Sequence, residues 1–150
     1  MEIIDKIPSI SPAKIDEFKN FLCNLDGALI GDSPEYLKVC PLKHSFVDGA
    51  YVREIFMPAG MFFVTKIHKK THPYFVLKGK VSVLIDDKIK VIEAPFSGIT
   101  QAGTQRIIYT HEDTVWVTVH VTDETDLEKI EKEIITEYTH HAIQHEKETI

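Results

Sequence analysis

Residues 58–79 read PAGMFFVTKIHKKTHPYFVLKG, and this stretch decides the fold. It holds two runs rich in β-branched and aromatic residues, 62–68 and 74–77, with basic and turn-forming residues between and after them. We predict a strand for each run. Because side chains alternate along a strand, Lys66 and His68 face the same way. A lysine and a histidine on an otherwise apolar strand face are unusual and mark the stretch as a candidate site.

Strand-like runs continue on both sides of this stretch and together predict a sheet-rich core over residues 51–122. They lie at 52–56, 81–85, 89–92, 107–109 and 115–121. Asp86-Asp87-Lys88 is a plausible hairpin turn between two of them. Many short strands at regular spacing favour a sandwich or small barrel over a parallel sheet.

Helical patterns flank this core. In the N-terminal segment, residues 1–50, Ser11-Pro12 predicts a helix start and Asp26-Gly27 its end. A second, shorter helix is expected to begin at Ser33-Pro34, and residues 41–49 read as a loop. Between Ser11-Pro12 and Asp26-Gly27, the apolar residues recur at helical spacing.

A C-terminal amphipathic helix is expected over residues 123–138, capped by Thr122 or Asp123. Its apolar stripe should cover the barrel or a second subunit. The polar tail, 139–150, carries a histidine pair at helical spacing that could chelate a metal, but we expect a solvated tail. The stripe is formed by Leu127, Ile130, Ile134 and Tyr138.

Composition limits the classes of function. The chain has 150 residues, which suits a single domain, 1–150, and its formal net charge of −6 argues against nucleic-acid binding. No signal peptide or membrane span is visible, so we expect a cytoplasmic protein. Cys23 and Cys40 are read as reduced, small apolar side chains.

The spacing within the opening stretch resembles the first motif of the cupins. That motif reads Gly, five residues, His-x-His, three or four residues, Glu, six residues, Gly. Here Gly60, Lys66, His68, His72 and Gly79 fall at the same intervals. The resemblance implies an all-β fold, a single cupin, jelly-roll-like barrel. Lysine stands in place of the first metal-binding histidine, and histidine in place of the glutamate.

The second cupin motif is matched more weakly, within residues 95–110. Gly103 is kept, and Arg106 stands where the family has another metal-binding histidine. The chain also resembles small cupin-like proteins of unassigned role from phages and prophages, through residues 51–60 and 111–116. In such a setting the protein could sequester a nucleotide-like signal used in host defence.

The substitutions favour an anionic ligand over a metal. Lysine and arginine offer no lone pairs and repel a cation, so we expect no cofactor, although a divalent metal stays open. Arginine offers a fork for carboxylate or phosphate. The predicted ligand-binding residues are Lys66, His68, His72, Arg106, Tyr74 and Phe62.

A metal-dependent enzyme, an isomerase or oxygenase, is the first alternative. It would use His68 and His72 with a third histidine, His120 before His44 or His111. The sequence does not decide which face of the 115–121 strand points inward, so the place of His120 stays open. A virion structural or interaction protein with a vestigial pocket is the second alternative.

The predicted partners are an anionic small molecule and a second copy of the chain. The amphipathic helix and Trp116 are the apolar surfaces expected to support a homodimer. Neither nucleic acid nor membrane is expected as a partner.

Overall fold

The computed structural model describes residues 17, 29, 33–85 and 88–135. Several predictions therefore lie outside the described residues: the first helix of the N-terminal segment, the turn at Asp86-Asp87, Tyr138 and the tail 139–150. Cys23 lies outside them too, whereas Cys40 is a buried free thiol. In the described part of the chain, no helix has the length and apolar character needed to span a membrane.

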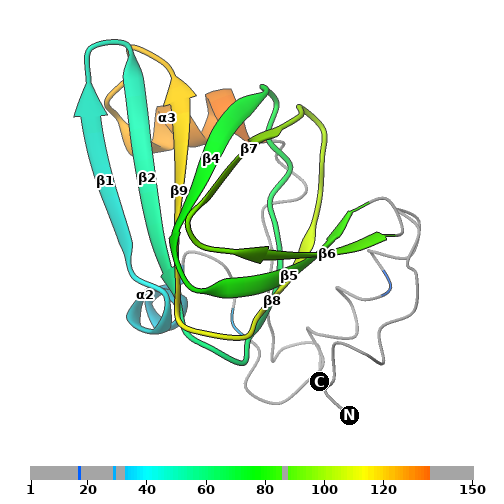
Figure 1. Cartoon of the computed structure of the whole chain (residues 1–150). Coiled ribbons are helices and arrows are strands. Elements are labelled where there is room, and N and C mark those ends of the chain that lie inside the picture. Colours follow the sequence, from blue (N-terminus) through cyan, green and yellow to red (C-terminus); the bar gives the residue numbers. More distant parts are fainter. Residues whose placement is uncertain (1–16, 18–28, 30–32, 86–87, 136–150) are drawn as a thin grey trace.

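The described strands form two antiparallel sheets, which confirms the all-β prediction (Figure 1). The five-stranded sheet has the order β1 (Leu42–Val47), β2 (Ala50–Met57), β9 (Thr114–Val121), β4 (His72–Lys78) and β7 (Phe96–Thr100). The four-stranded sheet has the order β3 (Phe62–Val64), β8 (Ile107–Thr110), β5 (Lys80–Ile85) and β6 (Lys88–Glu93). Figure 1 shows β1, β2, β9 and β4 side by side, with β5 and β6 running away from them at an angle.

The centre of the larger sheet is β9, which pairs with β2 on one side and β4 on the other. Trp116, Thr118 and His120 on this strand are buried, whereas Val121 is 78% exposed. This decides the orientation that the sequence left open: the face with Trp116 and His120 points inward. The valines between them lie on the outer face of the sheet.

An apolar core fills the space between the two sheets. Val76 from β4, Val81 and Val83 from β5, and Ile92 from β6 are almost inaccessible to solvent. Trp116 belongs to the same core and is 7% exposed, so the expectation that it offers apolar surface to a second subunit is wrong. Burial raises the pKa of Cys40 to about 12, which keeps this thiol protonated and consistent with an apolar structural role.

Two local predictions differ from the structure. The segment read as a loop, 41–49, contains β1, an edge strand whose mostly exposed side chains lack the apolar alternation that marks a half-buried strand. The strand expected over 62–68 ends at Val64, because pairing with β8 stops at Ile107. The predicted hairpin is confirmed, since Ile85 pairs with Lys88.

Gly79 connects β4 to β5 where the two sheets pass close to each other. Its φ is +99°, and a Cβ built on it would collide with the carbonyl oxygen of Asp113. Only glycine therefore fits this position without displacing backbone. The last glycine of the cupin-like spacing is thus explained by close packing as well as by backbone conformation.

Two helices border the described sheets. The short α2 (Pro34–Val39) begins as predicted, with Ser33 accepting a hydrogen bond from the Tyr36 amide. The C-terminal helix α3 (Leu127–Ile134) is shorter than expected and is capped by Asp126 instead of Thr122 or Asp123. Its apolar stripe packs through Ile130 and Ile134 against Tyr51 and Ile135, so it covers one end of the larger sheet.

Candidate functional site

Three histidines from different parts of the chain meet at the end of the sheet covered by α3. His68 follows β3, His72 begins β4, and His120 lies near the end of β9. Their ring centroids are 4.3 Å apart for His68 and His72, 5.0 Å for His68 and His120, and 4.4 Å for His72 and His120. One nitrogen from each ring lies within 4.8 Å of the others.

Strand pairing brings two of the rings together. Tyr74 pairs with Thr118 across β4 and β9, and His72 and His120 lie two residues further along the same inward face. The sequence named all three histidines as metal candidates, but only this pairing places His120 in the cluster.

His68 reaches the cluster from a loop that is fixed on two sides. Its carbonyl accepts a hydrogen bond from the Gly103 amide at 2.9 Å, and the residue forms an isolated bridge with Ile135 after α3. The adjacent Lys69 amide donates to the Ile134 carbonyl at 2.6 Å. Gly103, the one residue of the second cupin motif kept by identity, therefore helps to hold His68 in place.

Hydrogen bonds constrain which ring nitrogens carry protons. His72 Nδ1 lies 3.1 Å from the Lys70 carbonyl, which can only accept, so Nδ1 is the donor and Nε2 of the neutral ring has a lone pair. His120 Nε2 is 3.2 Å from Thr118 Oγ1, a group that can donate or accept. Within the described residues, His68 Nδ1 is buried without any hydrogen-bond partner.

The surroundings keep all three imidazoles neutral. Burial, followed by the proximity of His72, lowers the pKa of His68 from 6.5 to about 2. Burial and the same neighbour lower the pKa of His120 to about 3. The pKa of His72 is lowered by burial and further by Arg106, against the opposing effect of its bond to Lys70. Neutral imidazole is the form that binds a metal.

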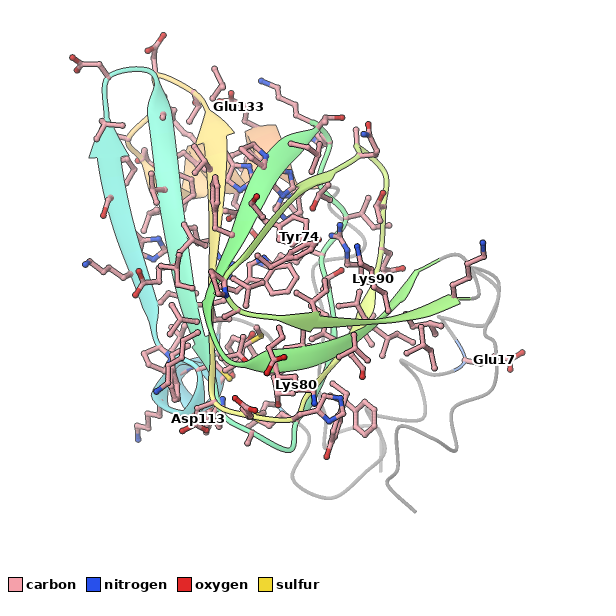
Figure 2. The ribbon with its side chains drawn as sticks, in the orientation of Figure 1. Glu17, Tyr74, Lys80, Lys90, Asp113 and Glu133 are labelled. Atoms are coloured by element: carbon pink, nitrogen blue, oxygen red, sulfur yellow. The ribbon has the colours of Figure 1, made fainter. Side chains whose placement is uncertain are left out.

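Arg106 is a buried cation beside this cluster. It is 7% exposed, and its Nε has no hydrogen-bond partner among the described residues. The guanidinium carbon lies 5.2 Å from the centroid of the Tyr74 ring. Tyr74 in turn stacks on Trp116 with centroids 4.7 Å apart, and Figure 2 shows it within the barrel. Arg106 is therefore supported by an aromatic pair.

Lys66 belongs to the same cavity but has a partner. Its Nζ lies 2.7 Å from Glu131 Oε1 on α3, with 12% of the lysine side chain and 46% of the glutamate side chain exposed. The lysine thus ties the loop before His68 to the C-terminal helix. Its positive charge is largely compensated by this carboxylate, so it is less available to an anionic ligand than the sequence alone suggests.

A cavity of about 550 Å³ connects these groups. Lys66, His68, His72, Arg106 and His120 all line it, so the structure brings these five predicted residues together. Much of the remaining wall is apolar and comes from both sheets. Among these wall residues are Ile55, Met57, Phe63, Val64, Ile108 and Trp116.

The other candidates lie elsewhere or have different roles. Phe62 is not part of the cavity wall, and its ring packs against Tyr109 at 4.7 Å. Tyr74 contacts Arg106 without lining the cavity. His111 bonds to Ser82 at 2.6 Å, and His44 lines the cavity while its Nδ1 lies 2.6 Å from the Tyr51 hydroxyl.

Arg53 on β2 is a cavity residue that sequence reasoning missed. Its positive charge contributes to lowering the pKa of His68 and of His120. The alternation of Tyr51, Arg53 and Ile55 along one strand face was the signal that could have revealed it.

Comparison with known proteins identifies the fold and nothing narrower. No protein-family model matches the sequence, and no curated protein sequence matches it. Among solved structures, a mutant form of salicylate 1,2-dioxygenase from Pseudoaminobacter salicylatoxidans is similar, with a TM-score of 0.52 and 8% identity. The match covers 65% of this chain and 29% of that one.

Two further solved structures have lower TM-scores. An RmlC-like cupin from Shewanella frigidimarina has a TM-score of 0.48 and 17% identity, over 63% of this chain and 83% of that one. An acetylacetone dioxygenase from Acinetobacter johnsonii has a TM-score of 0.46 and 17% identity, over 55% of this chain and 59% of that one. The chain therefore matches under two thirds of the length of both dioxygenases.

The all-β fold predicted from the sequence is confirmed, and the similarity to the salicylate 1,2-dioxygenase shows a shared fold. The three-histidine cluster has the chemistry needed to bind a divalent metal. Three neutral imidazoles are a suitable donor set for such an ion. The lone pair of His72 is on Nε2, and His68 has a buried Nδ1 without a hydrogen-bond partner among the described residues. Nitrogens on one tetrahedral metal are roughly 3.4 Å apart, so small side-chain shifts would close the cluster.

Proposed function

We propose that this chain is a metal-binding, cupin-like protein that binds a small molecule beside a three-histidine centre. His68, His72 and His120 would hold the metal. One observation carries the proposal: three neutral imidazoles, two of them buried and one partly buried, converge within 4.8 Å from three separate segments at the wall of a cavity. Three protein ligands are also the number that leaves a position for a further ligand in catalytic zinc sites.

The cations that replaced the family's usual ligands do not exclude a metal. Lys66 is paired with Glu131, which reduces its repulsion of an ion. Among the described residues, Arg106 has no carboxylate partner in the cavity. The metal ligands would then differ from those of the two cupin motifs. His72 would replace a glutamate, and His120 would come from a strand outside both motifs.

The chain's own residues would prepare the site for chemistry. The Lys70 carbonyl orients the His72 ring through Nδ1, an arrangement typical of metal-binding histidines. Apolar side chains of the cavity wall would lower the polarity around the centre. A bound divalent metal would supply Lewis-acid chemistry to a small molecule in this cavity.

A metal-free protein that binds an anionic small molecule is the second candidate. The buried Arg106, with its unpartnered Nε, supports it. The narrower forms of this idea, a nucleotide-like signal sequestered by a phage protein and a virion structural role, rest on sequence resemblance alone. They remain proposals.

Metal analysis separates the two candidates. Purified protein is equilibrated separately with Mn²⁺, Fe²⁺, Co²⁺, Ni²⁺ and Zn²⁺ and freed of excess metal. The bound metal per chain is then measured by elemental mass spectrometry. We expect about one equivalent of at least one metal per chain, because the donor set is neutral and close. The His120→Ala variant should lose it, and the matched His111→Ala variant should keep it.

The histidines of the tail need their own control. A variant with His140, His141 and His145 all changed to alanine should still bind one equivalent. Wild-type protein without stoichiometric metal, or His120→Ala protein that retains it while folded by circular dichroism, would contradict the proposal.

A further inference from the structure

Arg106 is a buried charge for which the described residues supply no counter-ion. The ion pairs among the described residues are Lys66 with Glu131 and Lys70 with Glu133, and neither includes Arg106. It is 7% exposed, and the Nε of its guanidinium has no hydrogen-bond partner in the described part of the chain. A buried charge is costly unless it is paired, so this guanidinium is a candidate site for a bound anion.

The guanidinium is held ready for that anion. The Arg106 amide donates to Thr65 Oγ1 at 2.9 Å, and the Thr65 amide donates to the Arg106 carbonyl at 2.9 Å. The side chain then lies over Tyr74, which rests on Trp116. With its backbone fixed and its plane supported by a ring, the side chain loses little freedom when it binds a ligand.

The rest of the cavity limits the class of anion. Its wall is largely apolar, and the carboxylates of Glu128 and Glu131 also line it. A single guanidinium pairs with a single anionic group, and the apolar wall favours a ligand whose remaining surface is apolar. A guanidinium edge also matches the two oxygens of a carboxylate in a bidentate pair.

We infer that Arg106 anchors the carboxylate of an apolar monocarboxylic acid, and so selects the molecule bound beside the three histidines. This inference rests on the proposed function for the place of the ligand. It deepens that function by naming the class of ligand and the residue that selects it.

Binding measurements on matched ligands test the inference. Metal-equilibrated protein is titrated by calorimetry with 3-phenylpropionate, its neutral amide 3-phenylpropanamide, and phenethyl phosphate. Wild-type protein should prefer the carboxylate over the amide by about tenfold or more, because the amide leaves the guanidinium unpaired. Arg106→Gln should reduce this preference to about onefold, and Lys78→Met, which removes an exposed lysine outside the cavity wall, should leave it unchanged.

A measurement on the wild-type protein covers the case in which Arg106→Gln fails to fold. The ¹H–¹⁵N resonance of Arg106 Nε, assigned with Arg106→Lys, should shift downfield on adding 3-phenylpropionate and remain in place with the amide. An unmoved resonance, equal affinity for carboxylate and amide, or tighter binding of the phosphate would overturn the inference. So would a carboxylate preference that survives in Arg106→Gln.

Metal content measured on the same samples distinguishes the two proposals. Stoichiometric metal without a carboxylate preference means that the inference fails and the proposed function stands. A carboxylate preference that depends on Arg106 in protein without metal means that the inference about Arg106 stands and the proposed metal-binding function fails.

Discussion

Burial determines the protonation state of the three histidines. His72 and His120 are each 4% exposed, and the described residues around them include no carboxylate partner for any of the three rings. An imidazolium would be charged in a poorly solvated place next to Arg53 and Arg106, so the neutral ring is favoured. The cluster is therefore a set of lone-pair donors at neutral pH.

The neutral cluster predicts that the metal-free protein loses stability in acid. The unfolded chain takes up a proton on each histidine near pH 6.5, whereas the folded protein does so only at lower pH. Below about pH 6.5 the unfolded state binds more protons, so the free energy of unfolding falls by up to about 1.4 kcal/mol per pH unit for each histidine.

Urea unfolding of metal-free protein at pH 7.5, 6.5 and 5.5 measures this effect. The His120→Gln variant should show a shallower dependence on pH than the wild type. Equal or greater stability at pH 5.5 than at pH 7.5 would contradict the assignment of neutral, buried histidines.

Gly79 provides a test of close packing at a single residue. Gly79→Ala should lower the free energy of unfolding by about 2–4 kcal/mol, since its Cβ would collide with backbone at Asp113. Gly60 is the matched control: it also has a positive φ, +82°, but no atom within 4 Å of an added Cβ. Gly60→Ala should cost only about 1 kcal/mol. Equal losses in chemical denaturation would be inconsistent with this account.

At the residue scale, the sequence predicted which residues form the candidate site better than it predicted the contacts of those residues. The cupin-like intervals placed Lys66, His68, His72 and Arg106 at one cavity, because each interval fixes a position on a strand or turn. The pairing of Lys66 with Glu131 was not predictable, since these residues are 65 positions apart. Neither sequence pattern nor spacing reports such a contact.

At the scale of elements, α3 forms part of the cavity wall and covers one end of the larger sheet. Leu127, Ile130 and Ile134 line the cavity, and the Lys66–Glu131 and Lys70–Glu133 ion pairs connect the helix to the loop that carries His68. The helix thus contributes both to enclosure and to the placement of a proposed ligand.

Packing of α3 can be tested with two aliphatic positions on the same helix. Ile134→Ala should lower the free energy of unfolding by about 2–4 kcal/mol, because the side chain is 3% exposed within an apolar cluster. Leu127→Ala should cost about 0.5 kcal/mol, because that side chain is 44% exposed. The measurement is thermal or urea unfolding. Similar effects at the two positions would argue against the described packing of the helix.

Sequence analysis missed the edge strand β1 and left the orientation of β9 open, and both outcomes have physical causes. The edge strand β1 has mostly exposed side chains, so it lacks the alternation that identifies a strand. The strand β9 has valines on its outward face and His120 on its inward face, the reverse of the usual apolar interior. The local sequence pattern reveals neither that β1 is a strand nor which face of β9 points inward, because pairing with neighbouring strands determines both.

At the scale of the whole molecule, two sheets enclose an apolar cavity whose described polar groups gather near α3. The motif spacing predicted this fold because turns and strand lengths, not the ligands themselves, set the intervals. The homodimer stays a prediction, and the interior position of Trp116 removes one of its two grounds. The C-terminal helix, the other ground, packs against its own sheet through Ile130 and Ile134.

Anomalous diffraction from crystals of zinc-loaded protein, recorded on both sides of the zinc absorption edge, is the most direct measurement. We predict a single strong peak within about 2.3 Å of one nitrogen from each of His68, His72 and His120. A peak located only at other residues, or an empty cluster in crystals grown with saturating zinc, would contradict the account.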